Sequence, residues 1–403
     1  MGKLSWTWIL LLAAALVLGA ALALPLALAQ EGDDPPGEDV TPTPDDSPPP
    51  VETPPPSAVR EFPRTDFSRH SVSYSEIMSG GPPKDGIPAI DNPKFVAVDE
   101  ADEWLEPTES VVLFRLGEDT RAYPIQILMW HEIVNDVVDS APVVVTYCPL
   151  CNTGIAFDAM VEGQALDFGT TGRLRISNLI MYDRQTESWW QQATGEAIVG
   201  AFTGARLNFL PVSIVAWEDF KAAFPEGLVL SRETGYYRDY GRNPYVGYDD
   251  AGNWPFLYRG SVPGALPPMA RVLTIDTEDE AAAYPYEVME TVRVVNDTVG
   301  GMPVVVMWSP GAASPLDASA VSAGREVGAA LAYSRVLDGD ELTFHFDGEE
   351  IVDDQTGSVW DGLGRAVSGK LEGSQLNEVP AINHFWFSWA AFKPETRIYE
   401  GDS

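Results

Sequence analysis

An internal repeat most constrains the fold of this 403-residue chain. The segment AYPIQILMWHEIVNDVVDSAPVVVTYCP begins at Ala122, and AYPYEVMETVRVVNDTVGGMPVVVMWSP, which matches it, begins at Ala283. Further matching segments follow in the same order, beginning at Asp183 and Asp353, and then at Gly204 and Gly373. The repeated order predicts two related lobes that arose by an internal duplication.

The repeated segments are rich in residues typical of β-strands. EIVNDVV and PVVVTY are β-branched runs on either side of a short turn, and the second copy has Gly300–Gly301 at that turn, which suits a two-residue hairpin. Each copy closes with a segment of helical apolar spacing, SIVAWEDFKAAF in the first. The sequence predicts an α+β, mainly β fold, with an N-terminal lobe over 59–235 and a second, degenerate lobe over 236–403.

The N-terminus carries the features of an export signal. Lys3 precedes an apolar run from Leu4 to Leu28, and ALA at its end is a small-x-small cleavage site. Residues 1–29 are therefore predicted to be a secretory signal peptide or, if retained, a membrane anchor. Residues 30–58 are acidic, Pro-rich and free of aromatic residues, which predicts a disordered linker. We expect a secreted, periplasmic or surface protein, tethered if the first segment is kept.

The charge of the chain limits its partners. The formal net charge is −35, and such an acidic surface repels nucleic-acid phosphates and anionic lipid headgroups. We therefore expect no nucleic-acid partner, and membrane contact only through the N-terminal segment. The expected partner is a small molecule or a metal donor or acceptor.

The chain has two cysteines, Cys148 and Cys151, and both stand in TYCPLCNTG. The second copy has Ser309 in place of Cys148 and Val292 in place of His131, while the apolar strand residues persist. A purely structural role would more easily be kept in both copies. The first lobe is therefore predicted to carry the chemistry and the second to serve as a scaffold.

Hairpin geometry suggests which groups meet. If Asp139–Ser140 forms the turn, Val138 pairs with Ala141 and His131 falls opposite Cys148. Directly opposed residues have Cβ atoms about 4.5–5.5 Å apart. This register predicts an imidazole beside a thiol.

Three functions fit these residues, and the first is metal handling or metal-centred redox chemistry. Thiolates of Cys148 and Cys151 with the imidazole of His131 suit copper, which we favour, or zinc. Met181 or His384 would complete the shell of ligands.

The other two functions need no metal. In a thiol-based redox or nucleophilic enzyme, Cys148 would attack, His131 would act as base and Cys151 would resolve the intermediate. Asp183 is a further candidate base, although its D-x-Q-T-x-S-x-W element occurs in both copies and so favours a turn that builds the fold. In a cell-surface binding module, the aromatic loop Tyr236–Tyr258 would grip a ligand and the cysteines would form a structural disulfide.

Long motifs in the chain resemble a known family. The segments SGGPPKDGIPAIDNPKF, RAYPIQILMWHEIVND, VTYCPLCNTGIAFD, FGTTGRLRISNLIMYDRQTESWW and NPYVGYD are similar to an exported prokaryotic domain family of unknown function, with the signature WHEIVND followed by TYCPLC. The resemblance spans Phe62 to Tyr399. It implies a secreted or membrane-tethered protein and lends no activity, substrate or cofactor. Residues of the family's types stand here at His131, Glu132, Asp136, Cys148, Cys151, Asp183 and Ser188.

Overall fold

The computed structural model describes residues 52–401. The predicted signal peptide or anchor over 1–29, and the predicted linker up to residue 51, lie outside the described residues. Helix α1 (Pro56–Glu61) occupies the end of that predicted linker, and proline suits a first helical position because its missing N–H has no partner there. No helix within residues 52–401 has the length and apolar character needed to cross a membrane.

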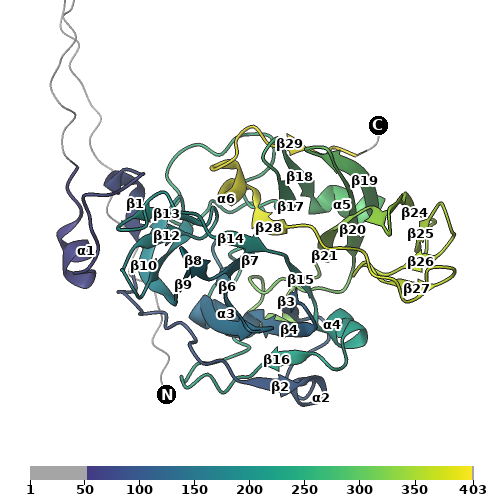
Figure 1. The fold of residues 1–403 in the computed structure, drawn as a ribbon, viewed down its shortest axis with the longest axis horizontal. Helices are drawn as coiled ribbons and strands as arrows, with labels where there is room; N and C mark the ends of the chain where they lie inside the picture. Colours follow the sequence, from purple (N-terminus) through teal and green to yellow (C-terminus); the bar gives the residue numbers. More distant parts are fainter. Residues whose placement is uncertain (1–51, 402–403) are drawn as a thin grey trace, which may run out of the picture. The chain divides into compact units, whose positions relative to one another are not determined.

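The described chain is mainly β with few helices, as predicted (Figure 1). Three sheets and a small hairpin make up its first half. The first sheet has the order β15 (Val212–Ala216), β3 (Ser110–Leu116), β4 (Asp119–Pro124), β16 (Leu228–Leu230), β2 (Phe95–Ala97). The second has the order β14 (Asn208–Leu210), β7 (Thr153–Asp158), β6 (Ala141–Cys148), β5 (Ile133–Val138). The third has the order β1 (Ile77–Ser79), β10 (Phe168–Arg175), β11 (Asn178–Asp183), β12 (Trp189–Gln191), β13 (Glu196–Val199).

Short elements connect these strands. The small hairpin is β8 (Met160–Val161) with β9 (Gln164–Ala165). The helices are α2 (Val98–Ala101), α3 (Ile125–His131) and α4 (Trp217–Ala223), with a 3₁₀ turn over Tyr74–Glu76.

The second half orders its strands in a similar way. Its first sheet is β28 (Ala381–Phe385), β17 (Arg271–Asp276), β18 (Ala281–Pro285), β29 (Arg397–Ile398). Its second sheet has the order β19 (Val294–Val299), β20 (Met302–Ser309), β21 (Ala329–Ser334). Its third sheet has the order β24 (Phe344–Phe346), β25 (Ile351–Asp353), β26 (Val359–Trp360), β27 (Ala366–Ser368). A hairpin of β22 (Val336–Leu337) and β23 (Asp340–Glu341) completes this half. The helices are α5 (Tyr286–Val292) and α6 (Trp386–Ala390), with a 3₁₀ turn over Val321–Ala323.

The repeated sequence segments occupy equivalent places in the two sets of sheets. The order β28-β17-β18-β29 repeats β15-β3-β4-β16, and the pairs β18–β29 and β4–β16 are both parallel. The β5–β6 turn lies at Asp139–Ser140 and the β19–β20 turn at Gly300–Gly301, all four residues with positive φ. This is the two-residue hairpin that the sequence predicts, with Val138 paired to Ala141.

One predicted helix is shorter than its sequence pattern. SIVAWEDFKAAF has helical apolar spacing, yet its first residues form β15, where Val215 pairs with Val111 of β3. Helix α4 begins only at Trp217, with Glu218 and Asp219 in its first turn, where the helix dipole favours negative charge. Sheet pairing of the β-branched residues overrides the local helical pattern.

The two halves share apolar cores. One core joins Val111 and Val215 of the first half to Val305 and Tyr333 of the second. Another contains Phe385 of β28 together with both cysteines. Figure 1 shows β28 in yellow, and this strand packs against β7 and β15 of the first half. A strand of the second half thus lies against the CPLC turn.

Candidate functional site

The two cysteines meet in the turn between β6 and β7. Cys148 ends β6, the Cys151 N–H donates to the Cys148 carbonyl at 3.1 Å, and Asn152 closes the turn with a φ of 51°, which asparagine tolerates. The Cys148 thiol donates to the sulfur of Cys151 at 3.1 Å. Both thiols are free and buried. The turn therefore holds a dithiol in direct contact.

One amide side chain, held by two others, faces the sulfur of Cys151. The Asn178 amide donates a hydrogen bond to this sulfur at 3.3 Å. The Cys151 thiol in turn donates to the Ser177 carbonyl at 3.6 Å. Asn178 also donates to Gln192, and Gln191 donates to Asn178. This buried network fixes the amide that faces the sulfur, because each polar group in it is oriented by the next.

Glu132 is the carboxyl group that acts on the thiol of Cys148. It ends helix α3 with a left-handed φ of 59°, and its carbonyl accepts a hydrogen bond from the N–H of Tyr147, the neighbour of Cys148. No hydrogen bond or ion pair to its carboxyl group is found among residues 52–401. Burial raises the pKa of Glu132 to about 8. Burial, the contact with Cys151 and the Glu132 charge together raise the pKa of Cys148 well above its usual value.

The predicted position of His131 beside Cys148 is wrong. WHE completes helix α3 instead of extending the strand, and β5 begins only at Ile133, which pairs with Thr146. His131 Nδ1 lies 2.7 Å from the Pro88 carbonyl, and Nε2 lies 2.7 Å from the Tyr240 hydroxyl. Since a carbonyl only accepts, Nδ1 carries the proton and Nε2 accepts from Tyr240. Burial lowers the pKa of His131 to about 4, so the ring is neutral near pH 7.

The predicted metal ligands do not come together as a set. In the described part of the chain, no group of three or more His, Cys, Asp or Glu side chains is arranged to hold a metal ion. Met181 is buried in β11, between Thr170 and Trp190 of the neighbouring strands. The structure thus brings Cys148 and Cys151 together and does not bring His131 to them.

His384 does reach the CPLC turn from the second half. Its Nδ1 lies 3.0 Å from the Thr153 hydroxyl, and the N–H of the next residue, Phe385, donates to the Cys151 carbonyl. Its buried Nε2 has no hydrogen-bond partner among the described residues. Burial lowers the pKa of His384 to about 3, which keeps the ring neutral.

Asp183, the second candidate base, stabilises the turn that follows it in the chain. Its carboxylate accepts from the N–H and hydroxyl of Thr186 and from the indole of Trp190 at 3.0 Å. Asp353 of the second half makes the same contacts with Thr356 and Trp360. The repetition supports a structural role for the D-x-Q-T-x-S-x-W element.

Two tyrosines that sequence reasoning did not single out cover the site. They belong to the connecting segment, residues 235–263, which joins the halves. The Tyr248 hydroxyl donates to the Leu150 carbonyl at 3.0 Å, inside the CPLC turn. Burial, together with the Glu132 and cysteine charges, raises the pKa of Tyr245, and burial with the cysteine charges raises that of Tyr248. The aromatic composition of the segment was the signal that could have identified them.

The fold and the site define a mainly β protein with a buried cysteine pair between a hairpin and a connecting segment. The chain belongs to the family described as proteins of unknown function (DUF3179), which matches residues 84–396. No curated protein matches the chain. No solved structure matches it either.

Proposed function

We propose that Cys148 and Cys151 form a dithiol–disulfide redox pair. The contact of 3.1 Å between their sulfur atoms supports this most directly, because few atoms must move to close the bond. Oxidation removes two electrons and two protons from the thiols and forms one S–S bond. A disulfide in a small molecule or protein would accept both and become two thiols, by exchange through a mixed disulfide.

In this function, Glu132 would accept the proton of a buried thiol. A thiol with a raised pKa reacts only if a nearby group takes its proton, and an acceptor with a pKa near the working pH does this best. A pKa of about 8 suits Glu132 for this task. The engagement of His131 with Pro88 and Tyr240 argues against His131 as that base.

The raised pKa of Cys148 also predicts a reducing couple. Strong oxidants of this type owe their high potential to a stabilised thiolate in the reduced form. Burial opposes that thiolate here. We therefore expect a reduction potential below about −200 mV.

Soft-metal binding by the same two thiols is the second candidate function. Two thiolates on one turn suit copper or zinc, and His384, whose ring reaches Thr153, could come closer in a bound form. Two thiolates on zinc, with bonds of about 2.3 Å, stand about 3.8 Å apart in a tetrahedral site. The two sulfur atoms, now 3.1 Å apart, would have to open for this site and to close to about 2.05 Å for a disulfide, so their distance does not separate the two functions. Redox chemistry is the better supported function because no third His, Cys, Asp or Glu side chain joins the pair as a metal ligand among the described residues.

One titration tests both functions and the structural disulfide of a binding module. The purified protein is equilibrated in dithiol/disulfide buffers of graded potential, trapped by alkylation and counted by mass, with metal content measured in parallel. We expect a reversible two-electron couple that Cys148→Ser and Cys151→Ser each abolish. Ser309→Ala, at the equivalent place in the second half, should leave it unchanged.

Other results would decide against the redox pair. One metal ion per chain, lost in Cys148→Ser, would support the metal site. A disulfide that resists excess dithiothreitol in the folded protein would support a structural clip. Cysteines that never oxidise in the folded protein would remove the proposed function.

We further infer that the two lobes, 59–235 and 236–403, arose by internal duplication. The shared strand order and the equal hairpin turns support this origin. We also propose that the protein acts outside the cytoplasm, since residues 1–29 have the composition of a signal peptide or anchor. N-terminal sequencing of the native protein, with cell fractionation, would test the location and the cleavage.

A further inference from the structure

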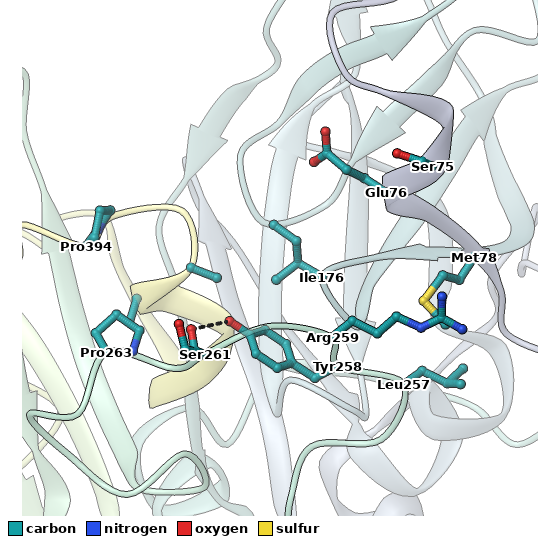
Figure 2. Close-up of a pocket in the computed structure, with 12 residues that line it drawn as sticks. Ser75, Glu76, Met78, Ile176, Leu257, Tyr258, Arg259, Ser261, Pro263 and Pro394 are labelled. Carbon is teal, nitrogen blue, oxygen red and sulfur yellow. Dashed lines mark hydrogen bonds between the residues drawn. The ribbon is translucent and has the colours of Figure 1, made fainter. Parts of the chain in front are cut away.

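A cavity of about 470 Å³ lies where the β10–β11 turn meets the connecting segment and the end of α6. We propose that it binds the substrate of the dithiol, a low-molecular-weight disulfide with an apolar or aromatic body and a carboxylate. The inference rests on the proposed function and names its substrate class. Figure 2 shows the lining, which includes Glu76, Met78, Ile176, Leu257, Tyr258 and Arg259.

The backbone that lines the cavity also contacts the sulfur of Cys151. Ile176 lines the cavity, and the carbonyl of the following residue, Ser177, accepts the hydrogen bond from the Cys151 thiol. The Ser177 hydroxyl donates to the Phe256 carbonyl, and the residue after Phe256, Leu257, again lines the cavity. A layer of backbone that includes residues 176 and 177 therefore contacts both the cavity and this sulfur.

That layer contains a strained turn. Ile176 and Ser177 have φ values of 56° and 60°, the left-handed pair of a two-residue hairpin between Arg175 and Asn178. A β-branched residue rarely adopts this conformation, and strain of this kind is often found at functional sites. A shift of the turn would open Cys151 to the cavity.

The charges at the cavity favour an anion. Arg259 lines it, and no ion pair or hydrogen bond to this guanidinium is found in the part of the chain that the structure describes. The Glu76 carboxylate is already occupied, by Arg175 at 2.7 Å and by the N–H of Ser73 at 3.2 Å. A chain of net charge −35 thus presents an available cation here. A guanidinium binds a carboxylate through two parallel hydrogen bonds.

The rest of the lining favours an apolar or aromatic body. Met78, Ile176 and Leu257 supply apolar side chains, and Pro263 and Pro394 supply rigid ones. The Tyr258 hydroxyl donates to the Ser261 carbonyl, which leaves its ring beside the space (Figure 2). Apolar walls with one charged group are typical of small-molecule sites.

The geometry assigns the order of the two steps. The Cys151 thiolate attacks one sulfur of the bound disulfide, whose S–S bond breaks, and half of the ligand leaves as a thiolate. The Cys148 thiolate then attacks the sulfur of Cys151 and releases the second half. The ligand gains two electrons, the cysteine pair loses two, and the two thiol protons pass by way of Glu132 to solvent or to the released thiolates.

Two aromatic disulfides of different charge test the cavity. The reduced protein is mixed with 5,5′-dithiobis(2-nitrobenzoate), which carries two carboxylates, or with neutral 4,4′-dithiodipyridine, and the released thiol is followed by absorbance. Arg259→Gln should slow the first reagent about five- to tenfold, the worth of one good ion pair, and leave the second within twofold. Arg206→Gln, which removes the same charge at a second cavity, should change neither.

The outcomes separate this inference from the proposed function. If Arg259→Gln leaves the rate with the dicarboxylate unchanged while the neutral reagent oxidises the pair, the cavity is not the substrate site and the redox pair stands. A larger effect of Arg206→Gln than of Arg259→Gln would likewise overturn the cavity and leave the redox pair standing. If neither reagent oxidises the folded protein, both proposals fail.

Discussion

Glu132 and Arg293 occupy the same place in the two halves of the molecule. Each ends a short helix with a left-handed φ, 59° and 65°, and each carbonyl accepts a hydrogen bond at 2.8 Å from the opposite strand, from Tyr147 and Trp308. Their side chains differ in effect. The Glu132 charge raises the pKa of a buried thiol, whereas the Arg293 guanidinium lies 4.3 Å from the centre of the Trp308 ring.

The comparison separates the backbone frame from the chemistry that it carries. Helix ends, hairpin turns and the Asp183 and Asp353 turns repeat in both halves, and these features rest on local hydrogen bonds. The thiols and the carboxyl group of Glu132 have no equivalent in the second half, where Ser309 and Arg293 stand in place of Cys148 and Glu132. Positions at which the two halves share a backbone conformation but differ in their polar side chains therefore indicate where the functional site lies.

The largest effect on stability in this comparison should come from Glu132→Gln. In the folded state Glu132 keeps its proton up to about pH 8, while in the unfolded chain it loses the proton near 4.5. The wild-type protein therefore loses stability as pH rises from 4.5 to 8. We expect Glu132→Gln to gain roughly 5 kcal/mol at pH 9 and almost nothing at pH 4, since the two pKa values differ by about 3.5 units and one unit is about 1.4 kcal/mol. Urea unfolding at both pH values measures this.

Arg293→Gln is the matched control for that substitution. It should cost less than about 1 kcal/mol, the usual size of a cation–π contact at a partly exposed site, and show no pH dependence between 4 and 9. An equal gain for Glu132→Gln at both pH values would mean that the carboxyl group is not buried as a proton-holding group. That result would argue against Glu132 as the acceptor of the thiol proton.

A smaller and symmetric effect is expected for Asp183→Asn and Asp353→Asn. Each substitution weakens charge-assisted hydrogen bonds to a threonine and a tryptophan indole. We expect each to lower the free energy of unfolding by about 2 kcal/mol, and neither to change the rate of dithiol oxidation in the folded protein. If only Asp183→Asn slows oxidation, at unchanged stability, Asp183 is the proton acceptor.

The sequence predicted the frame better than the site. The β-branched runs and the two-residue turns placed β5 and β6 in the correct register, because side-chain alternation and turn length determine pairing. The prediction for His131 was wrong because the end of a helix can depend on the conformation of a single residue. Glu132 takes the left-handed conformation that ends α3, a choice that neither apolar periodicity nor β propensity indicates.

Contacts from distant segments were harder to foresee. His384 was predicted to reach across from the second lobe, and it does reach Thr153, although no contact with a sulfur atom is found in the described residues. Tyr248 and Ser177 approach the CPLC turn through the packing of the connecting segment and of the β10–β11 turn. These contacts depend on tertiary packing between distant segments, and no local pattern in a single sequence indicates such packing.

The smallest effect should come from the contact between His131 and the connecting segment, which has no counterpart in the second half, where Val292 stands. Tyr240→Phe removes the hydroxyl that donates to His131 Nε2 at 2.7 Å and leaves a buried nitrogen without a partner. We expect a loss of about 1 kcal/mol in urea unfolding at pH 7. Tyr237→Phe, at a side chain that is 97% exposed, should have no effect. A loss of the dithiol couple in Tyr240→Phe, with stability unchanged, would instead give His131 a direct part in the redox site.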